Sequence, residues 1–152
     1  MRQGLVAGLA LLAMTAPAGA VVVRDCDSDA TASVTNIVEP WEKNTKLFYK
    51  GQVRVALLDT GGEPACCSLH LLILSPGLAQ DEPPFTACHI VSDHDNFGFG
   101  NIGFDKIAAS YDPKAGLLIT FPMIVSNGDD VQKPGVAKIR LNLGKGTVKV
   151  EK

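Results

Sequence analysis

Short apolar segments that alternate with polar residues recur along this chain, and they limit its possible folds more than any other feature. Successive side chains of a strand point to opposite faces, so a period of two indicates a half-buried strand. The clearest case places Val53, Val55 and Leu57 on one face and Gln52 and Arg54 on the other. Gly, Pro, Asn and Asp residues separate such segments, as turns require. The expected strands are 31–38, 47–58, 66–74, 85–92, 106–111, 117–125, 137–143 and 148–150.

This pattern predicts an all-β fold. Residues 21–152 show no amphipathic helix of ordinary length, and their size suits a single domain. Seven or eight short strands joined by turns are typical of an antiparallel β-sandwich of the Ig-like or Greek-key type. A partly open barrel is the second choice.

The first twenty residues are predicted to be a signal peptide. A basic residue, Arg2, precedes the apolar run 5–14, and Ala18-Gly19-Ala20 supplies small residues for cleavage. The run is shorter than the roughly 20 residues that cross a bilayer, so we expect no membrane span. The mature protein is therefore expected to be secreted or periplasmic. The full chain has a formal net charge of −2, and removal of the leader with Arg2 leaves −3 without a basic stripe, so we expect no nucleic-acid partner.

Four cysteines in an exported chain predict two disulfides. If 66–74 is a strand, Cys66 and Cys67 point to opposite faces and do not pair with each other. We favour Cys67–Cys88 with Cys26–Cys66, and the swapped pairing Cys26–Cys67 with Cys66–Cys88 stays open. The chain has no Cys-x-x-Cys motif, which makes structural bridges a better interpretation than thiol chemistry or metal binding.

The segment Asp59-Thr60-Gly61 follows an apolar strand. It resembles the catalytic loop of retroviral-type aspartic proteases, in which two such aspartates meet across a dimer and activate water. The resemblance implies a catalytic role for Asp59. In that family Ala or Ser usually follows the glycine, whereas Gly62 stands here. The alternative is a plain hairpin turn between two apolar strands.

The region 92–104 contains the other candidate site. Asp93, His94, Asp95 and Asn96 offer oxygen and imidazole ligands, so a metal site at Asp93, His94 and Asp95 is one hypothesis. Glycines and aromatic residues follow, which makes a binding loop with Phe97 and Phe99 a second hypothesis. The competing interpretation buries the phenylalanines as a plug at one end of the sandwich.

No complete catalytic constellation can be assembled from these residues. We therefore predict an exported, disulfide-stabilised β-sandwich with a non-enzymatic binding or envelope-structural role and no cofactor. Its partner would be another protein or a peptide. The alternatives are an aspartic peptidase-like enzyme using Asp59 and a periplasmic metal-binding protein using the 93–96 loop.

Overall fold

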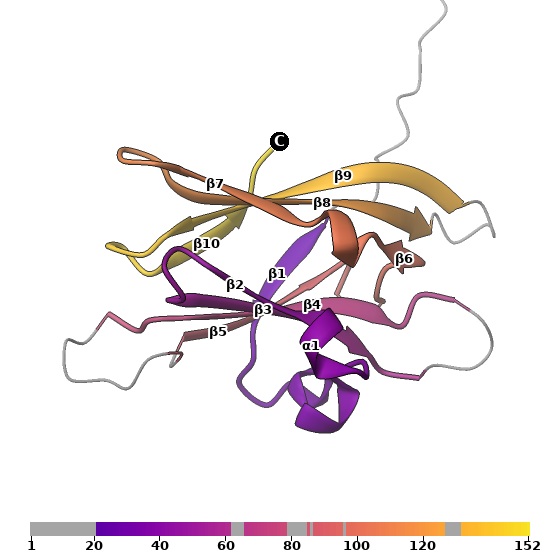
Figure 1. Ribbon diagram of the computed structural model, residues 1–152. Helices are drawn as coiled ribbons and strands as arrows, with labels where there is room; N and C mark the ends of the chain where they lie inside the picture. The colour runs from indigo at the N-terminus through magenta and orange to yellow at the C-terminus, as the bar shows by residue number, and fades with distance from the viewer. Residues whose placement is uncertain (1–20, 62–65, 79–84, 86, 96, 127–131) are drawn as a thin grey trace, which may run out of the picture.

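Two antiparallel five-stranded sheets pack face to face in this computed structural model, which describes residues 21–61, 66–78, 85, 87–95, 97–126 and 132–152 (Figure 1). The first sheet has the order β1-β5-β4-β3-β2. β2 to β5 follow one another as neighbours, and β1 lies beside β5 at the far edge. Its strands are β1 (Val22–Asp25), β2 (Thr45–Phe48), β3 (Val53–Asp59), β4 (Leu69–Ser75) and β5 (Ala87–Ser92).

The second sheet is built around two long strands. It has the order β10-β9-β8, and both β6 and β7 pair with successive parts of β8. The β8–β9 pairing runs from Leu117 opposite Leu141 to Ser126 opposite Gln132. Its strands are β6 (Asn101–Ile102), β7 (Ala108–Asp112), β8 (Gly116–Ser126), β9 (Gln132–Asn142) and β10 (Thr147–Val150).

An apolar core fills the space between the sheets. The first sheet contributes residues such as Val55, Leu71 and Val91, all fully buried. Ile119 and Ile139 face them from the second sheet. The period-two alternation of the sequence therefore corresponds to the inner and outer faces of each sheet.

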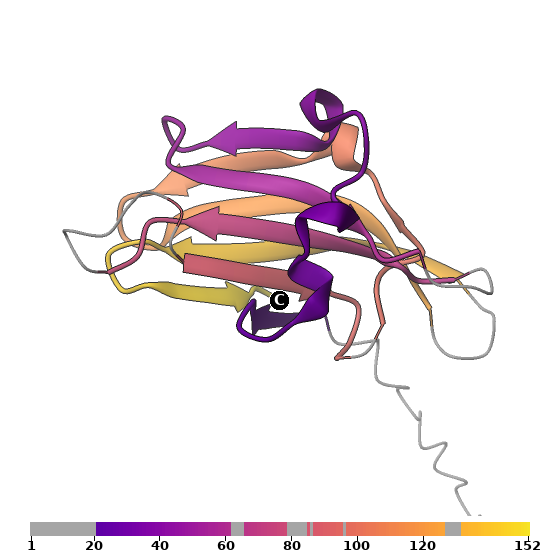
Figure 2. The ribbon, with the colours of Figure 1, turned by 90° about the horizontal axis from the view of Figure 1, so that it is seen from below.

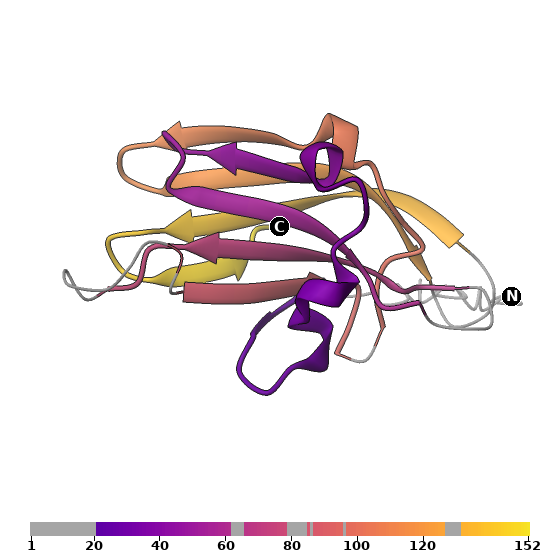
Figure 3. The same cartoon turned by 60° about the horizontal axis from the view of Figure 1, so that its bottom comes forward.

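The long connection from β1 to β2 covers the outer face of the first sheet, as Figures 2 and 3 show for the indigo segment. Two 3₁₀ turns, Ala30–Ala32 and Val34–Asn36, form its middle, and the short helix α1 (Trp41–Asn44) leads into β2. A small second core lies beneath it. The strands contribute Ala56, Leu58, Leu72 and Ile90, and the segment contributes Cys26, Ala32 and Ile37.

The predicted antiparallel β-sandwich is confirmed, but the expected number of strands was too low. The two sheets contain ten strands, because β1 and β6 were missed, the run 47–58 is divided into two strands, and the expected strand 31–38 is absent. Tyr49, Lys50 and Gly51 all have positive φ and form a turn between β2 and β3.

The predicted strand 31–38 was wrong. Asp29 and Ser33 each accept a hydrogen bond from a backbone N–H two residues later, which starts the two 3₁₀ turns. Such local side-chain bonds compete with strand pairing, and they outweigh the β-branched composition here. None of the helices in the described part of the chain is long and apolar enough to cross a membrane.

Candidate functional site

An open groove of about 980 Å³ lies on the outer face of the first sheet. One wall is the β1–β2 connection, which contributes Asp27, Asp29, Thr31 and neighbouring hydroxyl residues. The other side is formed where β3, β4 and β5 end or begin, at Thr60, His70 and Asp95. The groove exists because the covering segment is irregular and leaves this corner of the sheet open.

Arg24 of β1 is held at the groove by Asp29. Its Nε and Nη2 atoms donate to Asp29 Oδ2 at 3.2 and 2.9 Å. The other oxygen of Asp29 accepts the N–H of Thr31. Partial burial disfavours ionisation of Asp29, but the bonds from Thr31 and Arg24 outweigh it and hold its pKa below the ordinary value. The charge of Arg24 is thus neutralised within the site.

His70 and Ser92 form a buried pair beside this ion pair. Neighbouring strands bring them together on the outer face, and His70 Nδ1 lies 2.7 Å from Ser92 Oγ. Arg24 Nη1 donates to the same Ser92 oxygen at 3.2 Å. Among the described residues, Nδ1 of His70 is the only partner of this hydroxyl that can accept its proton, because a guanidinium only donates. This arrangement favours the tautomer of His70 that carries its proton on Nε2.

The surroundings of His70 hold its pKa below the ordinary value and so favour the neutral imidazole. Burial lowers the pKa of its imidazole most, and the positive charge of Arg24 lowers it further, which outweighs the opposite effect of the carboxylates of Asp29 and Asp59. The residue is only 6% exposed, yet it belongs to the groove lining. Within the described part of the chain, Nε2 forms no hydrogen bond. In the favoured tautomer, Nε2 can donate to a ligand.

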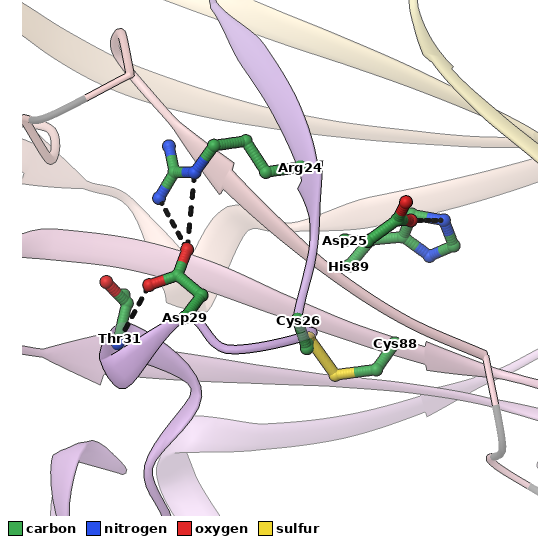
Figure 4. The surroundings of a disulfide bond; sticks show 7 residues. All are labelled: Arg24, Asp25, Cys26, Asp29, Thr31, Cys88 and His89. Atoms are coloured by element: carbon green, nitrogen blue, oxygen red, sulfur yellow. Dashed lines mark hydrogen bonds and ion pairs between the residues drawn. A yellow bond between two sulfur atoms is a disulfide. The ribbon is translucent and has the colours of Figure 1, made fainter.

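Asp25 follows Arg24 on β1, and its side chain points to the opposite side of the strand (Figure 4). Asp25 Oδ1 lies 3.3 Å from Nε2 of His89 on β5. Burial lowers the pKa of His89 although Asp25 raises it. Nδ1 of His89 is buried without a partner among the described residues. This pair lines a smaller depression of about 320 Å³ with Asp27 and Leu78.

Cys26 and Cys88 form a disulfide that fixes the covering segment to β5 (Figure 4). The backbone N–H of Cys26 also donates to the carbonyl of Cys88. This bridge lies between Arg24 and Asp29 in sequence, so it sets the position of the groove wall. Both non-vicinal pairings considered from the sequence were wrong.

Cys66 and Cys67 form the second disulfide, which the sequence argument had discarded. That argument required an extended backbone at these residues. The structure instead begins β4 at Leu69 and gives Cys67 a φ of +78°, so the two side chains do not point to opposite faces. The prediction of two disulfides with all four cysteines paired is confirmed. Such pairing is typical of proteins from oxidising compartments.

Asp59 ends β3 at an exposed turn. Its Oδ1 accepts the N–H of Gly61 at 2.9 Å, and Ser68 also donates a hydrogen bond to the carboxylate. These two bonds lower the pKa of Asp59. A peptidase dyad instead requires two close carboxylates, one of which has a raised pKa. The geometry at Asp59 is that of a capped turn.

The 93–99 loop is divided between surface and core. His94 and Phe97 stack at the surface, with ring centroids 4.8 Å apart, and Phe97 is 52% exposed. Phe99 is fully buried and packs edge to face on Phe121. Gly98 separates the two, and a Cβ there would lie 2.5–2.7 Å from backbone atoms of Cys67 and Leu69.

The proposed metal ligands diverge within this loop. Asp93 is fully buried, and its Oδ2 accepts the N–H of Ser126. His94 approaches it at 3.7 Å, whereas Asp95 is exposed at the rim of the groove. Asn96 lies outside the described residues. No group of three His, Cys, Asp or Glu side chains placed to hold a metal ion is found in the described ranges.

The sequence argument did not identify Arg24, Asp29 or His70 as site residues, and it included Ser92 only as the first residue of the region 92–104. Asp29 could have been recognised, because Asp followed two residues later by Thr is a common capping pattern. The meeting of Arg24, Ser92 and His70 depends on β1 pairing with β5. Nothing local in the sequence indicates that pairing.

Comparison with known protein families, with characterised proteins and with solved structures gives no match. The functional argument therefore starts from the geometry of the groove.

Proposed function

We propose that this protein is an exported, non-enzymatic binding protein, and that the groove beside His70 is its ligand site. The observation that supports this most is the chain of contacts from Asp29 through Arg24 and Ser92 to His70. Each buried polar group in it is bonded to the next. His70 is one of the residues that line the groove, and its Nε2 has no partner among the described residues.

A peptide segment of another protein is the ligand that suits this site. The groove is open along the outer face rather than enclosed, and its volume is at the upper end of the range of small-molecule pockets. Polar groups line its wall, including the hydroxyls of Thr31 and Ser33 and the amide of Asn36. Such groups can bond the backbone of an extended chain. The disulfide at Cys26 holds this wall in place before the ligand arrives, which reduces the entropy lost on binding.

Selection from a displayed library of random peptides tests this function. The purified protein is the bait, and every enriched peptide is measured again against two variants by fluorescence polarisation. Thr60→Trp places a large ring in the groove, whereas Ser110→Trp places the same ring on the exposed strand β7.

Peptides that bind the wild type and Ser110→Trp but not Thr60→Trp would support the groove as the ligand site. Peptides that bind all three proteins equally would place the site elsewhere. The absence of any enriched peptide would contradict the peptide-binding function itself.

A further inference from the structure

The groove is strongly acidic, and this charge points to a class of ligand. Four aspartates line it, Asp25, Asp27, Asp29 and Asp95, against a single arginine. Asp29 already neutralises Arg24, and Asp25 is shared with His89. Asp27 and Asp95 are exposed and have no hydrogen bond or ion pair to another described residue. Two carboxylates are thus left without a positive partner at the same groove.

An independent observation indicates which hydrogen-bonding groups a ligand needs in the groove. His70 is more than nine-tenths buried, it belongs to the groove lining, and its Nε2 has no partner among the described residues. A neutral donor in this place requires an acceptor on the ligand, such as a peptide carbonyl. The carboxylates at Asp27 and Asp95 require donors or a cation.

We propose that the groove binds an extended segment rich in lysine or arginine, with its basic side chains at Asp27 and Asp95 and a backbone carbonyl at His70. This inference rests on the proposed binding function and adds the chemistry of the ligand. An acidic segment would place like charges together and leave the two carboxylates unpaired, which disfavours binding. A metal ion is a weaker candidate because the carboxylates do not gather into a ligand set in the described ranges.

Three labelled peptides of equal length test the preference. One alternates Lys and Ser, one Glu and Ser, and one Gln and Ser, and each is titrated by fluorescence polarisation at pH 7.5 and low salt. The Lys peptide should bind at least about tenfold more tightly than the Gln peptide, and the Glu peptide should not bind. Raising the salt concentration should weaken the Lys peptide, because surface charges are screened.

The double variant Asp27→Asn with Asp95→Asn identifies the carboxylates. It should weaken the Lys peptide about tenfold, because it removes both carboxylates that pair with the basic side chains. The matched control is Glu42→Gln with Asp105→Asn, which changes the net charge equally at two exposed residues outside the groove. This control should bind like the wild type. Equal weakening in both double variants would mean that the overall net charge, and not the carboxylates of the groove, determines the affinity for the Lys peptide, and it would overturn the proposal.

Thr60→Trp distinguishes a failure of this inference from a failure of the proposed peptide-binding function. If the Gln and Lys peptides bind equally and both are blocked by Thr60→Trp, the groove binds peptides but the basic preference is wrong. If the Lys peptide binds and Thr60→Trp leaves it unaffected, both the groove and the preference are wrong.

Discussion

The two faces of the first sheet are covered in different ways, although the same strands supply both. On the inner face, Leu71 and Ile73 pack against a second regular sheet, and the interface is apolar throughout. On the outer face, Leu72 and His70 meet an irregular segment that brings both apolar and charged groups. A sheet facing a sheet produces a core, whereas a sheet facing a loop leaves room for a polar site at the loop's edge. The candidate site is therefore found on the less regular side.

The largest difference between the faces should appear when neighbouring leucines of β4 are shortened. Leu71→Ala leaves a cavity between two rigid sheets and should cost about 4–5 kcal/mol, the upper part of the range for such changes. Leu72→Ala should cost nearer 2 kcal/mol, because the covering segment can settle into the space. Urea unfolding of both variants measures the difference. An equal loss would mean that the segment is packed as rigidly as the core.

Removing the Cys26–Cys88 bridge should affect the outer face more than the inner one. Its two cysteines are 62 residues apart, so the double variant Cys26→Ala, Cys88→Ala should lose about 2–4 kcal/mol. Hydrogen exchange should rise at Ile37 and Val38 while Ile73 stays protected. The matched control replaces Cys66 and Cys67 by Ala. Because that bridge joins sequence neighbours, it restricts the unfolded chain little, and its loss should cost less.

The two faces also differ in how well their structure could be predicted from the sequence. The inner face was predictable because alternation in 53–57, 117–125 and 137–143 reports a face buried against a regular partner. The covering segment was not, because capping by Asp29 and Ser33 overrode its β-branched residues. The vicinal disulfide was missed because a positive φ at Cys67 has no sequence signal when the residue is not glycine.

The site depends on the same long-range features. Arg24, His70 and Ser92 lie on three strands that become neighbours only when β1 crosses to the far side of β5. Asp59 and the 93–96 residues attracted interest because they are adjacent in sequence. The groove residues are instead adjacent in space, and no short motif contains them.

Acidification should destabilise the protein through the histidines that flank β1. Burial lowers the pKa of both His70 and His89 below the ordinary 6.5. As the pH falls through 6.5, the unfolded chain takes up protons that the folded chain does not, so folding loses stability in this window. The loss is at most about 1.4 kcal/mol per pH unit and histidine, and it stops below the folded pKa.

Thermal unfolding between pH 7.5 and 5 measures this slope. His70→Gln should remove the pH dependence that arises from the histidine at the groove. His89→Gln should remove the pH dependence that arises from the histidine paired with Asp25. Asp29 and Asp59 have lowered pKa values, so their contribution is lost only below about pH 4 and does not confuse the comparison. A slope that persists in the double variant would contradict the assignment to these two residues.

The smallest expected effect concerns Phe97, and it sharpens the comparison between surface and core within one loop. Phe97→Ala removes a half-exposed ring whose contact is the stack with His94, so the free energy of unfolding should change by less than about 0.5 kcal/mol. Phe99, two residues later, fills the core against Phe121, and Phe99→Ala should cost about 3–5 kcal/mol. Urea unfolding of the two single variants measures both changes. If Phe97→Ala instead costs several kcal/mol, the ring of Phe97 contributes to the core like that of Phe99, and the division of this loop between surface and core is wrong.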